Sequence, residues 1–277
     1  MICVGYLSSG IYRSVYGTSS LFSRSLLKPL TKDPLFEGHH RLSEAVSAIF
    51  KEYVCNRMPS KYSHDNSFYR IAMHKRTLGK GLGAATTYHY IRKVRLNCYG
   101  FVWKVVLSTH IKAGEKLKTK MQELSDKQGI PVSFDGTPCP LHFVEIFKQP
   151  DLKYWMRIQK LEEVEPGDIM VYLPPNHDPS CPPDWEKPTG THAMFVHSKE
   201  GKEGEGMQFS IIDSTRKAHC KEDSRFPKCS GIGNTPLTLI PKDEEQGIYL
   251  FQWGSNERQQ VKEVVVGRIV GENTVTV

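Results

Sequence analysis

The order of its sequence patterns constrains the fold of this chain more than any other feature. Apolar residues recur at helical spacing in the ranges 41–54, 98–108, 114–129 and 141–147. From Tyr154 onward, short β-rich runs separated by turn-forming residues take their place. These runs are YWMRIQ, DIMVYL, HAMFVH, QFSIID, GIYLFQW and EVVVGRIV. Helices followed by strands predict an α+β fold, in which the helices pack on a mainly antiparallel sheet.

Composition indicates a packed protein with an unusual N-terminal segment. Of the 277 residues, 39% are hydrophobic, which suffices for a sizeable core. No apolar run approaches the roughly 20 residues needed to span a bilayer. Residues 1–32 are rich in serine, contain basic residues and lack acidic ones, but they do not resemble a secretory signal. Two interpretations remain open for them: a flexible arm or a targeting segment.

Two glycine- and proline-rich segments predict loops. GKGLGA at 79–84 lacks the GKS or GKT ending of a phosphate-binding loop and is typical of a mobile turn. The range 173–190 holds six prolines, which predicts a long, stiff loop. A loop of this length is either a binding loop or lid, or a passive insertion.

The seven cysteines do not form a disulfide or zinc pattern. Their number is odd and no CxxC pair occurs, so neither a disulfide framework nor a metal site at His219, Cys220 and Cys229 is expected. Cys98 differs from the others because Asn97 predicts a helix N-cap directly before it. The partial positive charge of a helix N-terminus favours a thiolate, which makes Cys98 a candidate nucleophile. The alternative is a small buried core residue.

Basic residues concentrate around this cysteine. Between His74 and Lys120 the chain has eleven Lys and Arg but only one acid, Glu115. This bias predicts attraction of anionic substrates and a lowered thiol pKa. A solvated helix face explains part of it equally well.

A thiolate nucleophile needs a histidine that exchanges protons and a polar group that orients that histidine. His192 begins one predicted strand and Asp213 ends the next. His197 is an odd number of positions from His192, so on a regular strand the two point to opposite faces. His219 is the alternative candidate for the orienting group.

Three motifs resemble NlpC-type cysteine peptidases. NCYGFVWKVV is similar to their Asp-Cys-Ser-Gly-Phe-Val signature, although Asn97 and Tyr99 replace the usual residues beside the cysteine. VEPGDIMVYL is similar to their Pro-Gly-Asp-Leu strand, and THAMFVHS to their His-Val-Gly-Ile strand. DSTRKAHCKEDSR adds a further echo, in which Asp-Ser-Thr precedes a His and an Asp-x-Arg.

This resemblance implies a papain-like fold with Cys98 as nucleophile, His192 as acid/base and Asp213 as orienting group. It implies a cysteine peptidase or amidase without cofactor or metal, acting on a peptide or peptidoglycan-like amide. Residues 1–60 are interpreted as an arm with a packing helix, and 61–277 as the hydrolase domain with loop insertions. Members of the family are commonly exported, but no signal fixes the compartment here.

Two alternatives to hydrolysis stay open. The first is a transglutaminase, deamidase or acyltransferase of the same fold. The second is a catalytically inactive module that uses its basic face to bind anionic polymers. For the hydrolase we expect neither a membrane span nor a nucleic-acid partner.

Overall fold

A computed structural model describes residues 37–55, 60–63, 70–78, 85–130, 137–174, 190–226, 230–256 and 258–270. The segment 1–32, the glycine-rich turn at 79–84 and residues 175–189 of the proline-rich loop lie outside this part of the chain. No helix in the described part is long and apolar enough to cross a membrane.

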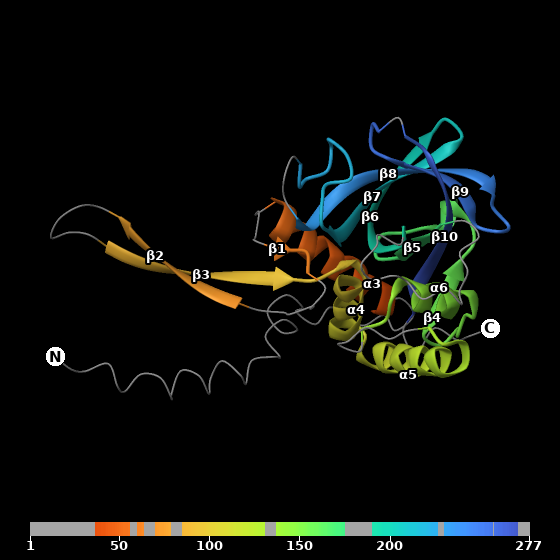
Figure 1. The fold of residues 1–277 in the computed structure, drawn as a ribbon, viewed down its shortest axis with the longest axis horizontal. Coiled ribbons are helices and arrows are strands. Elements are labelled where there is room, and N and C mark those ends of the chain that lie inside the picture. Colours follow the sequence, from red (N-terminus) through yellow and green to blue (C-terminus); the bar gives the residue numbers. More distant parts are fainter. Residues whose placement is uncertain are drawn as a thin grey trace.

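The sheet is a closed antiparallel barrel of six strands (Figure 1). Each strand pairs with the next one in chain order, and the last strand also pairs with the first, which closes the barrel. They are β5 (Ile169–Leu173), β6 (His192–Glu203), β7 (Gly206–Thr215), β8 (Gly231–Asp243), β9 (Ile248–Trp253) and β10 (Gln260–Ile269). A further strand, β4 (Trp155–Ile158), pairs with the end of β10. Closure satisfies strand edges that would otherwise be open.

Four α-helices in the described part of the chain pack against this barrel. They are α3 (Glu37–Ile49), α4 (Cys98–Thr109), α5 (Ile111–Gln128) and α6 (Pro140–Lys148). A π-helical turn (Phe50–Cys55) continues α3, and a short 3-10 helix (Leu161–Glu163) precedes β5. The predicted α+β class is confirmed, as are all four predicted helices. Closure of the sheet into a barrel was not predicted.

Two hydrophobic cores follow from the alternation of the strands. Along β6, Ala193 and Phe195 belong to the core between the barrel and the helices, whereas Met194 and Val196 belong to the core inside the barrel. This is the period of two expected of a strand buried on both faces. Each fully buried large side chain contributes about 1.5–3 kcal/mol through burial.

The contact between α6 and β10 depends on a glycine. A Cβ atom on Gly267 would lie only 2.3 Å from the ring of Phe147, so the missing side chain leaves the space that this ring fills. Phe147 is fully buried there and joins α6 to the outer core.

Strand β8 and a long hairpin were not predicted. The hairpin consists of β2 (Arg70–Leu78) and β3 (Ala85–Arg95), and the latter also pairs with the short strand β1 (Ser60–Lys61). In Figure 1 the hairpin extends away from the barrel. Its two strands contain six Lys and Arg and no acidic residue.

Candidate catalytic site at the mouth of the barrel

The N-terminus of α4 presents Cys98. Asn97 is the N-cap in an extended conformation, and its Oδ1 accepts a hydrogen bond from the backbone N–H of Gly100 at 2.6 Å. This confirms the predicted cap. Cys98 is therefore the first residue of the helix, where unpaired backbone N–H groups concentrate positive partial charge.

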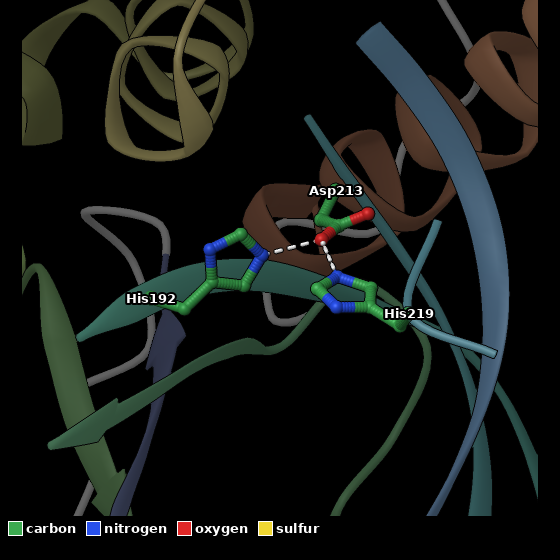
Figure 2. Close-up of side chains that lie close together, drawn as sticks. All are labelled: His192, Asp213 and His219. Carbon is green, nitrogen blue, oxygen red and sulfur yellow. Dashed lines mark hydrogen bonds and ion pairs between the residues drawn. The ribbon is translucent and has the colours of Figure 1, made fainter. Parts of the chain in front are cut away.

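His192 and Asp213 meet on the inner face of the barrel. Met194 and Ile211, each two positions along the same strand from one of them, line the barrel interior. His192 therefore points inward from β6 and Asp213 from β7. His192 Nε2 donates a hydrogen bond to Asp213 Oδ2 (Figure 2). His197 lies on the opposite face, as predicted, and stacks on Phe50 with ring centroids 4.1 Å apart.

The same histidine reaches the cysteine. The Cys98 side chain lies close enough to the His192 imidazole to raise its pKa. Because Nε2 faces Asp213, Nδ1 is the ring nitrogen left for the sulfur. The structure thus brings together all three residues predicted from sequence, Cys98, His192 and Asp213, although they come from one helix and two strands.

The neighbouring groups of the candidate site shift the pKa values of His192 and Asp213. Burial by itself lowers the pKa of His192, but the neighbouring Cys98 and Asp213 side chains raise it above its ordinary value. Burial likewise disfavours an ionised Asp213, yet Arg225, His219 and His192 hold its pKa well below the usual range. The arrangement favours the protonated imidazolium form of His192 beside an ionised Asp213.

His219 is a second imidazole on the same carboxylate. Its Nε2 lies 2.7 Å from Asp213 Oδ2, on the other side from His192 (Figure 2). Its backbone N–H donates to Asp223 Oδ2 at 2.9 Å, which fixes the loop that carries it. Burial lowers the pKa of His219, against the opposing effect of Asp213, so this ring serves as a neutral donor. The alternative third group proposed from sequence is therefore present in addition to Asp213.

Arg225 binds the second oxygen of the Asp213 carboxylate. Its Nη2 lies 2.7 Å from Asp213 Oδ1 and 2.8 Å from Asp223 Oδ2, and all three side chains are buried. The guanidinium also donates to the Gly231 carbonyl at 2.9 Å and to Thr235 Oγ1 at 3.1 Å. Sequence reasoning did not assign Arg225 a role, although it is the arginine of the Asp-x-Arg echo.

The cluster of His192, Asp213 and His219 is better suited to hydrogen bonding than to binding a metal ion. His192, Asp213 and His219 have ligand atoms within 4.8 Å of one another, and their side chains are of types that bind transition metals. Arg225 already neutralises the carboxylate, and both imidazoles face its Oδ2 through Nε2. A divalent cation there would add positive charge beside a buried guanidinium.

The cysteines considered as zinc ligands do not complete a site in the described part of the chain. Cys229 lies outside the described residues. The Cys220 side chain forms a hydrogen bond with Glu222, and burial raises the pKa of this thiol to about 11.

Two tyrosines that were not predicted from the sequence interact with the candidate site. Tyr172 lies directly across from His192 in the β5–β6 pair, with ring centroids 5.7 Å apart. Burial and the negative charge of Cys98 raise the pKa of both Tyr172 and Tyr62. The VEPGDIMVYL motif contains Tyr172, whereas no sequence signal marks Tyr62.

A second cysteine–histidine pair provides an internal contrast. Cys139 Sγ lies 3.2 Å from His142 Nδ1, and His142 Nε2 lies 2.9 Å from a hydroxyl, Ser125 Oγ. Burial raises the pKa of Cys139 to about 11 and lowers that of His142 to about 4. Without a carboxylate in the position of Asp213, this pair stays neutral.

Asp168 has the structural role predicted for it. Its Oδ2 accepts from the Glu165 backbone N–H at 2.8 Å, and Arg268 Nε donates to its Oδ1 at 2.8 Å. This pair closes the turn at the far end of β5 from Tyr172.

Comparison of the chain with models of known protein families, with curated proteins and with solved structures gave no match.

Proposed function

We propose that this protein is a papain-like cysteine hydrolase that cleaves an amide bond. The observation that carries the proposal is the bond of His192 to the ionised Asp213, together with the position of Cys98 at a helix N-terminus, from which it raises the pKa of His192. A helix that bears the nucleophile and an antiparallel sheet that bears the base and the orienting acid are the two parts of a papain-like site.

The proposed reaction begins with attack of the Cys98 thiolate on the substrate carbonyl. As the C–S bond forms, the carbonyl oxygen becomes an oxyanion, and the backbone N–H of Cys98 helps to stabilise it. His192 then donates its proton to the amine nitrogen while the C–N bond breaks, which releases the amine and leaves a thioester.

The second half of the reaction returns the enzyme to its starting state. Neutral His192 accepts a proton from a water molecule, whose oxygen attacks the thioester. The C–S bond breaks, the carboxylic acid leaves, and the thiolate and imidazolium are restored. Asp213 stays ionised throughout, because its role is to orient His192 and to stabilise its cationic form.

Acceptors other than water use the same thioester. An amine acceptor gives transamidation, and a glutamine substrate releases ammonia. Product analysis distinguishes them: a free acid and amine indicate peptidase activity, a new amide indicates transfer, and ammonia indicates deamidation. The Cys98–His192 contact favours these reactions over an inactive binding module.

Iodoacetamide alkylation of Cys98 as a function of pH, read by peptide mass spectrometry, tests the nucleophile. We expect the wild type to react near pH 6, well below the ordinary thiol pKa of about 8.5, and His192→Ala to lose this low-pH reactivity. Cys139 in the same digest is the matched comparator, since a neutral pair stays unreactive. Ordinary titration of Cys98 in both proteins would refute the thiolate–imidazolium pair.

A substrate screen then tests the reaction. Muropeptides and simple peptide amides are incubated with the wild type and with Cys98→Ala. Cleavage by the wild type alone supports an amidase, and cleavage of peptides but not of muropeptides would remove the cell-wall version of the proposal.

A further inference from the structure

Lys262 is a partly buried cation that has no acidic partner among the residues the structure describes. Its Nζ lies 3.5 Å from the Gly190 carbonyl oxygen and 5.2 Å from the centroid of the Tyr172 ring. No carboxylate of the described residues lies within 4 Å of this nitrogen. The adjacent residue, Glu263, pairs instead with Lys148 at 2.8 Å. A half-buried ammonium without a counter-ion is uncommon, because desolvation disfavours it.

The strand register places this cation at the mouth of the barrel. Val264 is the partner of Tyr172, and Lys262, two positions before Val264, shares its face of the sheet. Tyr172 in turn is the partner of His192. The two distances, 5.2 Å from Nζ to the Tyr172 centroid and 5.7 Å from there to the His192 centroid, place Nζ within about 11 Å of the catalytic imidazole.

None of the other charges that the structure describes around the mouth neutralises Lys262. The carboxylate of Asp213 is already shared by His192, His219 and Arg225. Arg216, on the loop after β7, is exposed and lies 5.9 Å from the Tyr62 ring centroid. Burial lowers the pKa of Lys262, and an anion bound beside it would reverse that effect.

We propose that Lys262 binds a carboxylate of the substrate and so selects amides that carry one near the scissile bond. The Tyr172 ring forms the apolar floor between this carboxylate and the catalytic imidazole. At about 3.3–3.6 Å per extended residue, a separation of up to about 11 Å suits a carboxylate within about three residues of the bond that is cleaved. This inference rests on the proposed function.

Competition between two alkylating reagents tests the proposal without a known substrate. Iodoacetate carries a carboxylate and iodoacetamide does not, while both report the same Cys98 thiolate. The ratio of their rate constants cancels the thiolate fraction, so it is independent of the pH test of the Cys98–His192 pair. At low ionic strength, Lys262→Met is expected to lower the iodoacetate-to-iodoacetamide ratio about fivefold, and Lys262→Arg to preserve it.

Lys153→Met is the matched control, because Lys153 Nζ also lies over a tyrosine ring, 5.3 Å from the Tyr154 centroid, but beside β4. Its ratio should equal that of the wild type. An unchanged ratio in Lys262→Met, or an equal fall in Lys153→Met, overturns carboxylate recognition while leaving the proposed chemistry intact. A Cys98 that reacts with neither reagent overturns both.

A substrate pair gives a second readout once cleavage is detected. For a peptide amide with a neighbouring carboxylate, Lys262→Met should raise KM about tenfold with little change in kcat. For the same peptide with that carboxylate amidated, KM should not change. An equal effect on both peptides would contradict the assignment.

Discussion

His219 lies flat on Trp253, with ring centroids 3.7 Å apart and an angle of 6° between the ring planes. This stacking holds the imidazole in the orientation in which its Nε2 reaches Asp213 at 2.7 Å. The carboxylate is consequently held by His219 on one side while it orients His192 on the other. His219 is thus a positioning residue, which acts on Cys98 only through Asp213 and His192.

Replacing His219 tests this role. His219→Ala removes one hydrogen bond to a buried carboxylate, so we expect alkylation of Cys98 at pH 6 to slow about tenfold and the low-pH limb of the profile to move upward. His219→Gln retains a side-chain N–H donor and should recover most of the rate. If His219→Ala matches the wild-type pH profile, Asp213 is positioned without it.

The charge of Asp213 predicts how stability depends on pH. Its folded-state pKa is depressed below the unfolded value of about 3.9, mainly by Arg225 acting against burial. Its contribution to the free energy of unfolding is therefore fully present above about pH 4 and is lost as the pH falls through the folded-state pKa. We expect Asp213→Asn to be about 3–5 kcal/mol less stable than wild type at pH 7, with a difference that shrinks on acidification. Urea denaturation at a series of pH values measures this, and a difference that grows toward low pH would contradict it.

Two arginine–aspartate pairs, each with a buried carboxylate, lie at opposite ends of the barrel and allow effects on stability to be distinguished from effects on reactivity. Arg225→Met breaks the pair with Asp213, and Arg268→Met breaks the pair with Asp168. Both variants should lose stability, by about 3 kcal/mol or more for the fully buried Arg225. Only Arg225→Met should slow alkylation of Cys98, since of these two guanidinium groups only that of Arg225 contacts Asp213. Equal slowing in both would indicate a general effect of lower stability.

The N-cap of α4 links helix stability to the thiol. Asn97→Ala removes the hydrogen bond to the Gly100 N–H and should cost about 1 kcal/mol of stability. The first helical turn would also hold its N–H groups less firmly around Cys98, so we expect alkylation at pH 6 to fall several-fold. Asn97→Ser keeps a capping oxygen and should resemble the wild type in both measurements. If Asn97→Ala lowers stability but leaves alkylation of Cys98 unchanged, the N-cap does not affect the reactivity of the thiol.

Local signals made the nucleophile and its helix predictable. An N-cap residue, apolar periodicity and a terminal glycine after α5 are encoded in neighbouring residues, and the structure places these helices as expected. His192 and Asp213 were predicted from their places on two consecutive predicted strands and from the family resemblance of these motifs. Strand alternation separated His192 from His197, because it decides which face a side chain occupies. These features depend on residues a few positions apart.

Long-range pairing accounts for what was missed. Strand β8 reads GIGNTPLTLIPKD, and its glycines and prolines are typical of loops. It is held as a strand by pairing with β7 and β9 and by Leu237 and Leu239 in the barrel interior. Arg225 and Lys262 gain their roles only from barrel closure, which brings the 216–226 loop and β10 to the same opening. No periodicity in the sequence contains that information.

Cys98 lies on a helix outside the barrel and His192 on the inner face of β6. The packing between α4 and β6 therefore affects how the two side chains are placed relative to each other. Phe101 of α4 meets Phe195 of β6 edge-on, with ring centroids 5.6 Å apart, one helical turn from the thiol and three residues from the imidazole. These two rings act as a spacer that sets the gap between sulfur and nitrogen. A slight loosening of this packing, by heat or by a smaller side chain, would remove the low-pH reactivity expected of Cys98 while the circular dichroism spectrum still looked native.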